Sequence, residues 1–451
     1  MSITVGMKRQ DLEKALRPVG VEIADERVDA CCLYVKSDAA EAVWIVLDFM
    51  DFNLNVVKTV RNAVSAKTGI AKEHVHILST HNHGGGTPDL QELADVVAGA
   101  ADEAKATARP AKMRTANTKP GKRVNYLRRI YVPELEGCTT YWFGTADFEG
   151  FETFDAAPHI EHAINEVVKG NLAYFGTEPT QRPYTPWPEA DDLLTAIEFR
   201  GLEDDAPIGA LVRFASHVNC SNGGSFLTGD FPNTLRRRLE EALGGNAMFL
   251  TGPCGDVCPW MAKKRDGTSV RIGNILADAA LEALKDAPFE PVTKFADLTQ
   301  PVDLPVRSEV LAGDVVIEGE MPEALPERRK YLEALRTKNS MDFLLEKYQE
   351  GEEGPLKETT EIQLGFLRLN DVIFAAFPGE TFSTTGEALR AAYPDVNIST
   401  VTEHWRTVMY LPPKADLANG SYEATCRVTD EGAAEILAEK SIETMAKFLK
   451  A

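Results

Sequence analysis

The chain has 451 residues, 44% of them hydrophobic, and its 48 lysines and arginines are outnumbered by 69 aspartates and glutamates. The formal charge of −21 repels phosphate backbones and anionic lipid surfaces, which argues against nucleic-acid and membrane partners. No stretch has the roughly 20 apolar residues that a membrane span needs.

The N-terminal residues and the cysteines indicate the cellular compartment in which we expect the protein. The first residues, "MSITVGMKRQDLEKAL", have no apolar run of signal-peptide type. The seven cysteines are typical of reduced thiols rather than of a disulfide framework. We therefore expect a soluble, cytoplasmic protein that acts on a small-molecule substrate, and a homo-oligomer is left open.

Strands and helices alternate through the first half of the chain. Residues 31–52 read as two strands around a polar turn, and residues 53–69 as a helix that Gly69 closes, before a strand at 74–80. The alternation returns as strand, helix and strand at 208–216, 231–245 and 247–252. This pattern predicts an α/β fold whose sheet is covered by helices.

A hairpin and a helix are predicted towards the C-terminus. Residues 362–380 read as two strands joined by a turn at Asn370 and Asp371. For the helix that follows, Thr381 and Ser383 are candidate N-terminal caps.

Two segments look less like framework. Residues 145–190 are rich in aromatic residues and proline, which suggests an insertion and a candidate lid, and residues 321–355 form a highly charged helical excursion. Because no Gly/Ser-rich linker separates these parts, we expect one domain over residues 1–451.

The stretch "LSTHNHGGGTPD" places two of the eight histidines, His81 and His83, just after a predicted strand. In an extended segment residues i and i+2 point to the same side, so both rings would project together. Ligands bind at the carboxyl ends of strands in open α/β sheets, and the glycines allow close approach of substrate or backbone. The alternative interpretation is a pair of hydrogen-bonded turn histidines.

Three further predicted strands end abruptly in polar residues and glycine. "LVRFASHVNCSNGG" carries His217, "AMFLTGPCGDVCPW" carries Cys258, and "VIFAAFPGETF" carries Glu380. Each alone is typical of a structural strand end, and Glu380 would also complement the dipole of the next helix. Together they supply imidazoles and a carboxylate, the usual ligands of a catalytic zinc, although spacing along the chain does not show that they converge.

These segments resemble the neutral (non-lysosomal) ceramidase family of zinc amidases. "STHNHGGG" resembles the family's Thr-His-Thr-His-Ser-Gly strand end, and "FASHVN" its second histidine segment. "TGDFPNTLRRRLEEALGGNAMFLTGPCGDVCP" resembles the run from its Gly-Asp turn to its Gly-Asp-x-Ser-Pro motif, and "FPGETFSTTGEALR" its Pro-Gly-Glu-Phe-Thr segment. "YLPPKADLANGSYEA" and "NYLRR" are weaker matches. No single motif is very specific, but all occur in the family's order.

The resemblance implies a fold and a ligand set. The fold would be that of the neutral-ceramidase catalytic domain, with mixed β-sheets covered by helices and an active site at strand ends. Carried over by position, His81 and His217 become zinc ligands through nitrogen, Glu380 the carboxylate ligand and Tyr422 the phenolic ligand.

The resemblance also implies roles beside the metal. His83 would stabilise an oxyanion or shuttle a proton, and Arg128 would orient a polar group of the substrate. A zinc with three or four such ligands keeps a position for water and lowers that water's pKa to about 7. The implied activity is therefore cleavage of an amide, or an ester or lactone, in a small soluble compound by metal-activated water, with one Zn²⁺ per chain.

The chain departs from the family at the serine of the Gly-Asp-x-Ser-Pro motif, which is Cys258 here. A thiolate can replace an obligatory nucleophile, whereas at a substrate contact the change would alter specificity; an inert buried thiol is a third reading. The secreted ceramidases also carry an export signal and a C-terminal β-sandwich, for which we see no room here. Ceramide is an apolar membrane lipid, which an acidic protein expected in the cytoplasm and without a membrane-binding feature is poorly placed to meet, so it is not the expected substrate.

Three other classes compete with this interpretation. A metallo-β-lactamase-like hydrolase with two metals continues its His-x-His with x-Asp-His, where this chain has Gly85 and Gly86. An amidohydrolase barrel begins with His-x-His but needs eight β/α units, which the pattern does not show. A metal-free binding or scaffold homologue would not need to keep both histidines, Glu380 and Tyr422.

Overall fold

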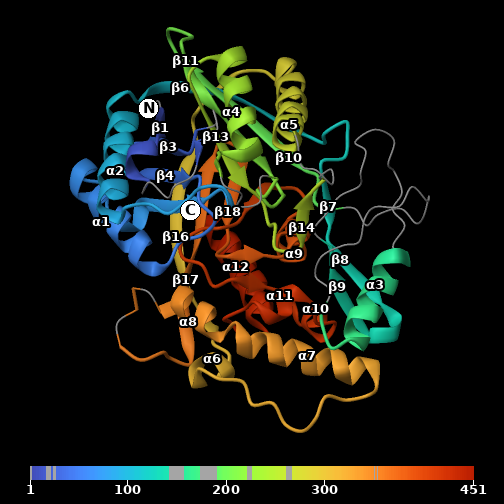
Figure 1. The fold of residues 1–451 in the computed structure, drawn as a ribbon. Coiled ribbons are helices and arrows are strands. Elements are labelled where there is room, and N and C mark those ends of the chain that lie inside the picture. The colour runs from blue at the N-terminus through green and yellow to red at the C-terminus, as the bar shows by residue number, and fades with distance from the viewer. Residues whose placement is uncertain are drawn as a thin grey trace.

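The computed structural model describes residues 3–16, 22–23, 27–141, 157–172, 190–220, 226–260, 267–349, 351–352 and 354–450 (Figure 1). The larger of its sheets has the strand order β13-β11-β10-β6-β1-β3-β4-β5, with β15 paired to β6. Its strands are β1 (Thr4–Asp11), β3 (Asp29–Lys36), β4 (Glu41–Leu47), β5 (Val75–Ser79), β6 (Arg109–Thr118), β10 (Leu194–Gly201), β11 (Pro207–Phe214), β13 (Asn246–Thr251) and β15 (Glu290–Pro291). This sheet folds back on itself, because β13 near one end contacts β1, β3 and β4 of the other half.

A second sheet has the order β16-β17-β18-β20. Its strands are β16 (Phe295–Pro305), β17 (Thr359–Leu369), β18 (Val372–Ala376) and β20 (Asn397–Val401). Four short ladders pair β2 (Glu22–Ile23) with β12 (Phe226–Leu227), β7 (Asn125–Leu127) with β14 (Val257–Pro259), β8 (Arg129–Val132) with β9 (Gly137–Thr140), and β19 (Glu380–Thr381) with β21 (Tyr410–Leu411).

Helices cover the outer faces of both sheets (Figure 1). The α-helices are α1 (Leu54–Thr68), α2 (Leu90–Ala106), α3 (Ala157–Val168), α4 (Asp230–Leu243), α5 (Thr268–Lys285), α6 (Ser308–Ala312), α7 (Leu325–Asn339), α8 (Met341–Gln349), α9 (Ser383–Ala392), α10 (Lys414–Ala418), α11 (Tyr422–Thr425) and α12 (Ala433–Phe448). Helices α1 and α2 pack on β3 and β4, α4 and α5 on β11 and β13, and α9 and α12 on the second sheet. Within the described ranges no helix is long and apolar enough to cross a membrane.

The central core lies where the two sheets face each other. Leu33, Trp44, Phe199 and Met248 from the large sheet meet Phe374 from the second sheet in one cluster of buried side chains. Because helices cover the opposite faces, most strands are apolar on both sides, which explains their continuous hydrophobic runs.

Parallel pairing sets where the strand ends lie. Within the two larger sheets most pairs are antiparallel, but β4–β5, β11–β13 and β18–β20 are parallel. The carboxyl ends of these pairs carry the segments with His81, His217 and Glu380. The predicted α/β class, with mixed sheets covered by helices, is confirmed.

Local signals along the chain predicted several boundaries correctly. Helix α1 begins after Asn53, whose side chain accepts a hydrogen bond from the Val56 amide at 3.0 Å, and it ends at Gly69 with φ 75°. The hairpin turn lies at Asn370, with φ 51°.

The predicted caps of α9 are wrong. Phe382 precedes the helix, and neither Thr381 nor Ser383 caps it with its own side chain. The carboxylate of Asp256, from another strand end, accepts from the Ser383 amide at 2.8 Å and from its hydroxyl at 2.7 Å. A long-range acceptor therefore satisfies the amide that a local hydroxyl was expected to satisfy.

The structure describes most of residues 321–355 but only part of residues 145–190, the two segments that look less like framework. Residues 321–355 contain helices α7 and α8, and Arg329 of α7 is buried and donates to the Leu135 carbonyl at 3.0 Å. Of residues 145–190, the structure describes 157–172 and 190, which include α3; the rest lies outside the described residues. The single-domain reading and the lid therefore stay predictions.

Candidate metal centre

His81 lies two residues beyond the end of β5 in a strained backbone. Its φ is 60°, a left-handed conformation that non-glycine residues adopt at a cost and that clusters at functional sites. Nδ1 of the ring lies 2.8 Å from the Met50 carbonyl. Gly85, in the loop that follows, packs against the Asp48 backbone so closely that a Cβ would collide with it. Gly85 thus serves close packing of the backbone.

His217 follows β11 and is brought beside His81 by pairing between the two strand-end segments. The amide of His83 donates to the Val218 carbonyl at 3.0 Å. The rings of His81 and His217 stand perpendicular, with centroids 4.6 Å apart. Nδ1 of His217 lies 2.9 Å from the Val257 carbonyl, at the start of β14.

Glu380 completes the convergence from the second sheet. It follows β18 and pairs with Tyr410 in the β19–β21 ladder. Its Oε2 lies 3.3 Å from Nε2 of His81 and 3.0 Å from Nε2 of His217. All three side chains are buried.

The donor and acceptor roles of these three side chains indicate that they can hold a cation. A carbonyl oxygen can only accept, so Nδ1 of His81 and of His217 must carry the hydrogen. In the neutral rings both Nε2 atoms are then acceptors, and they face the acceptor Oε2 of Glu380. Nη1 of Arg128 approaches Nε2 of His217 to 3.1 Å, but the close approach of Nε2 of His81 to Oε2 of Glu380 needs a proton or a metal cation between the two acceptors. The backbone carbonyls hold each ring as outer partners of metal-ligating histidines usually do.

The pKa values agree with this electrostatic picture. Burial alone would lower the pKa of His81, but the carboxylates of Glu380 and Glu403 outweigh it and raise the pKa to about 9. Burial and the charge of Arg128 lower the pKa of His217 to about 4. In the absence of a metal, a proton on His81 therefore supplies the positive charge that the site requires.

His83 lies beside this centre and is partly exposed. Its Nε2 is 3.4 Å from Nε2 of His81. One nitrogen each from His81, His83 and His217 lies within 4.8 Å of the other two, a grouping that can hold a metal ion. Burial, with the neighbouring His81 and His217, lowers the pKa of His83 well below its usual value, so its ring is neutral. His83 is close enough to be either a ligand or the neighbour that the sequence predicted.

Two tyrosines approach the centre, and the sequence predicted one of them. Tyr410, paired with Glu380, places its hydroxyl 3.5 Å from Nε2 of His217. Tyr422, the predicted phenolic ligand, stands edge-on to Tyr410 with ring centroids 5.6 Å apart. Burial, with Cys426 and Glu380 nearby, raises the pKa of Tyr422. Tyr410 is therefore a second candidate for the phenolic ligand that was predicted at Tyr422.

Arg128 is fixed as a buried cation next to His217. Its Nε donates to Glu423 at 2.7 Å and its Nη2 to the Gly255 carbonyl at 2.9 Å, while Nη1 lies 3.1 Å from Nε2 of His217. Burial disfavours the charged form, but Tyr410 and Glu423 among its neighbours raise the pKa of Arg128 well above its usual value. The guanidinium therefore stays charged and has little freedom to turn.

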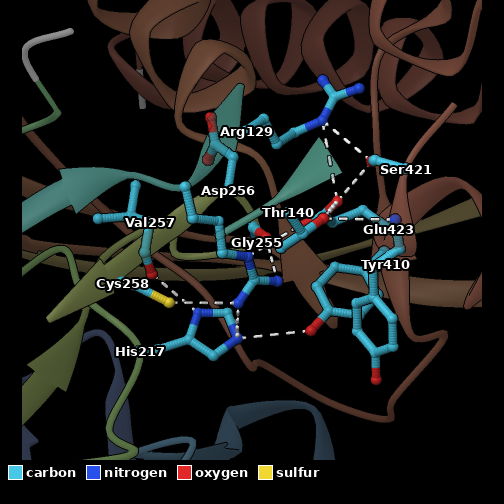
Figure 2. Close-up of polar contacts among 12 residues, drawn as sticks. Arg129, Thr140, His217, Gly255, Asp256, Val257, Cys258, Tyr410, Ser421 and Glu423 are labelled. Carbon is cyan, nitrogen blue, oxygen red and sulfur yellow. Dashed lines mark hydrogen bonds and ion pairs between the residues drawn. The ribbon is translucent and has the colours of Figure 1, made fainter. Parts of the chain in front are cut away.

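Cys258 reaches the same centre from β14 and is fully buried. Figure 2 shows the ring of His217 between Cys258 and Tyr410. The Cys258 sulfur lies 3.6 Å from Nη1 of Arg128. Burial raises the pKa of its thiol although Arg128 opposes this, so the neutral thiol dominates near pH 7. Such a group is a poor nucleophile in the resting protein.

Glu403 is a site residue that the sequence reasoning missed. It follows β20 with φ 59°, is buried, and places Oε1 3.3 Å from Nδ1 of His81. Burial, with Glu380 nearby, raises the pKa of Glu403 to about 8. The signal was present in "STVTEHW", another apolar strand that ends in polar residues. Tyr410 and Glu423 had no comparable signal, because each reaches the site through long-range pairing.

The fold is that of the neutral ceramidases. The neutral ceramidase from Pseudomonas aeruginosa superposes with a TM-score of 0.66 over 99% of this chain and 75% of that chain, at 14% sequence identity. A ceramidase complexed with C2 gives a TM-score of 0.65 over 100% of this chain and 76% of that chain, at 13% identity. No protein-family model matches the sequence, and no curated protein matches it significantly. At this identity the likeness shows the fold alone.

Proposed function

We propose that the protein is a zinc-dependent hydrolase that cleaves an amide, or an ester or lactone, bond of a small substrate. The observation that carries this proposal is the meeting of Nε2 of His81, Nε2 of His217 and Oε2 of Glu380 as three buried acceptors. His81, His217 and Glu380 would hold the ion, with Tyr422 as the proposed phenolic ligand. Imidazole and carboxylate also suit manganese, iron or nickel.

When bound, such an ion lowers the pKa of a coordinated water and polarises a carbonyl oxygen. The chain's own groups supply the remaining needs of acyl transfer. Arg128 is a fixed charge 3.1 Å from His217, suited to hold a substrate oxygen and to stabilise negative charge that develops on it.

His83 is suited to move a proton. It is neutral, partly exposed and 3.4 Å from His81, so its ring can accept a proton and pass it to a leaving amine. The likeness to ceramidases supports amide cleavage by analogy of fold.

Metal analysis of the purified chain, followed by a screen of small amides, esters and lactones, tests the proposal. One tightly held zinc per chain and cleavage lost on chelation are expected. Two metals per chain would favour a metallo-β-lactamase-like hydrolase, and a protein that takes up no metal would favour a binding or scaffold role.

A further inference from the structure

A cavity of about 630 Å³ adjoins the candidate metal centre. Its walls come from the loops after β4 and β5, from the first turns of α1 and α2, and from Glu346 of α8. His83 joins the cavity to the centre, because it lines the cavity while its Nε2 lies 3.4 Å from that of His81. Cavities of this size take small molecules, so a ligand bound here would lie next to the groups that hold the metal.

The charge of the cavity is negative. Asp51 and Glu346 line it, and the described residues of its wall include no lysine or arginine. Asp51 and His83 line the same cavity, so the negative charge of Asp51 lies on the side of the cavity that adjoins the centre.

Two aromatic residues also line the cavity. Phe49 and Phe52 line the same wall and meet edge to face, with ring centroids 5.8 Å apart. The faces of aromatic rings attract organic cations, and carboxylates pair with ammonium groups. An anionic ligand would meet only repulsion from the two acidic side chains.

We propose that this cavity binds an ammonium group of the substrate, so that the preferred substrates are small amides or esters that carry an amine near the scissile carbonyl. This inference rests on the proposed hydrolase activity for its placement beside the metal. Asp51 and Glu346 act here as specificity-determining residues.

Four amides of equal chain length test the charge preference. γ-Aminobutyramide carries an ammonium group, γ-hydroxybutyramide is neutral, and succinamate is an anion. The trimethylammonium analogue of the first is a cation that cannot coordinate a metal through nitrogen. Binding of each to the zinc-loaded protein is measured by ligand-detected NMR, and cleavage is measured separately by release of ammonia.

Both cations are expected to bind about tenfold more tightly than the neutral amide, which is the effect of one favourable charge pair. Glu346→Gln and Asp51→Asn should each reduce this preference severalfold. The matched control is Glu241→Gln, an exposed carboxylate on α4 outside the cavity wall, and it should leave the preference unchanged. Circular dichroism shows whether each variant is folded.

Binding and cleavage separate the two proposals. Equal or tighter binding of the neutral or anionic amide, no binding of either cation, or a preference that both cavity variants retain would overturn the ammonium site. Tight binding of the cations without cleavage of any amide would overturn the hydrolase and leave the ammonium site standing. Cleavage of the amides without a preference for the cations would overturn the ammonium site and leave the hydrolase standing.

Discussion

Oε1 of Glu403 lies 3.3 Å from Nδ1 of His81, so this imidazole has a carboxyl group beside each of its nitrogens, Glu380 being the other. Both His81 and Glu403 have left-handed backbones, with φ of 60° and 59°. Such strained backbones persist only where the surrounding structure holds them in place, and they cluster at functional sites. The strain at both residues of this contact therefore indicates that their relative position serves the function of the site.

Replacing Glu403 with glutamine should weaken zinc binding by about 10- to 100-fold, the usual effect of losing an outer partner of a metal ligand. The amide keeps the shape of the side chain, but unlike Glu403 it cannot lose a proton to give the negative charge that offsets the bound cation. Competition with a chelating dye measures the affinity. Glu403→Asp, which keeps the charge, should recover part of the loss, and equal affinities for wild type and Glu403→Gln would contradict the role.

Zinc affinity should rise with pH. The pKa of His81 is about 9 without metal, so the ring is protonated at neutral pH and must lose its proton before Nε2 can bind an ion. Affinity should therefore increase by up to about tenfold per pH unit from pH 7 towards 9 and then level off. Calorimetry in buffers of different ionisation enthalpy would detect the released proton; a flat profile would show that His81 is already neutral.

His81→Ala and His217→Ala should each remove bound metal and activity together, because either change leaves Glu380 with a single imidazole partner. Metal content by mass spectrometry and turnover of one amide are the two measurements. His162→Ala on helix α3 is the matched control and should keep both. A variant that is free of metal and still active would contradict the assignment.

Cys258→Ser should keep turnover within about tenfold of wild type if water is the nucleophile, since the buried neutral thiol is then only a neighbour of Arg128. Complete loss of turnover with metal content unchanged would instead favour a covalent mechanism. Trapping of an acyl-enzyme by mass spectrometry distinguishes the two outcomes directly.

Tyr410→Phe and Tyr422→Phe form a matched pair that decides which phenol serves the metal. If Tyr422 is the ligand, its loss should lower zinc affinity while Tyr410→Phe leaves affinity close to wild type. The reverse result would assign the role to Tyr410, whose hydroxyl lies 3.5 Å from His217.

The shared position of His81 and His83 was predicted for a reason that only partly holds. An extended segment would place residues two apart on the same side, and Nε2 of one ring does lie 3.4 Å from that of the other. However, β5 ends at Ser79 and the backbone at His81 is left-handed. The rings meet because the Met50 carbonyl and the pairing of His83 with Val218 position them.

The sequence by itself determined several strands, helices α1 and α4, and the residues that carry imidazole and carboxylate groups at strand ends. Side-chain periodicity and capping act between residues close in the chain, so a pattern such as Asn53 to Gly69 defines a helix without help from elsewhere. Only the tertiary structure decided which strand ends meet. His81 and His217 come from opposite halves of one sheet that folds back, and Glu380 comes from a second sheet. Their meeting, and the arrival of Glu403 and Tyr410, depends on how the buried faces of the two sheets pack, which no local pattern records.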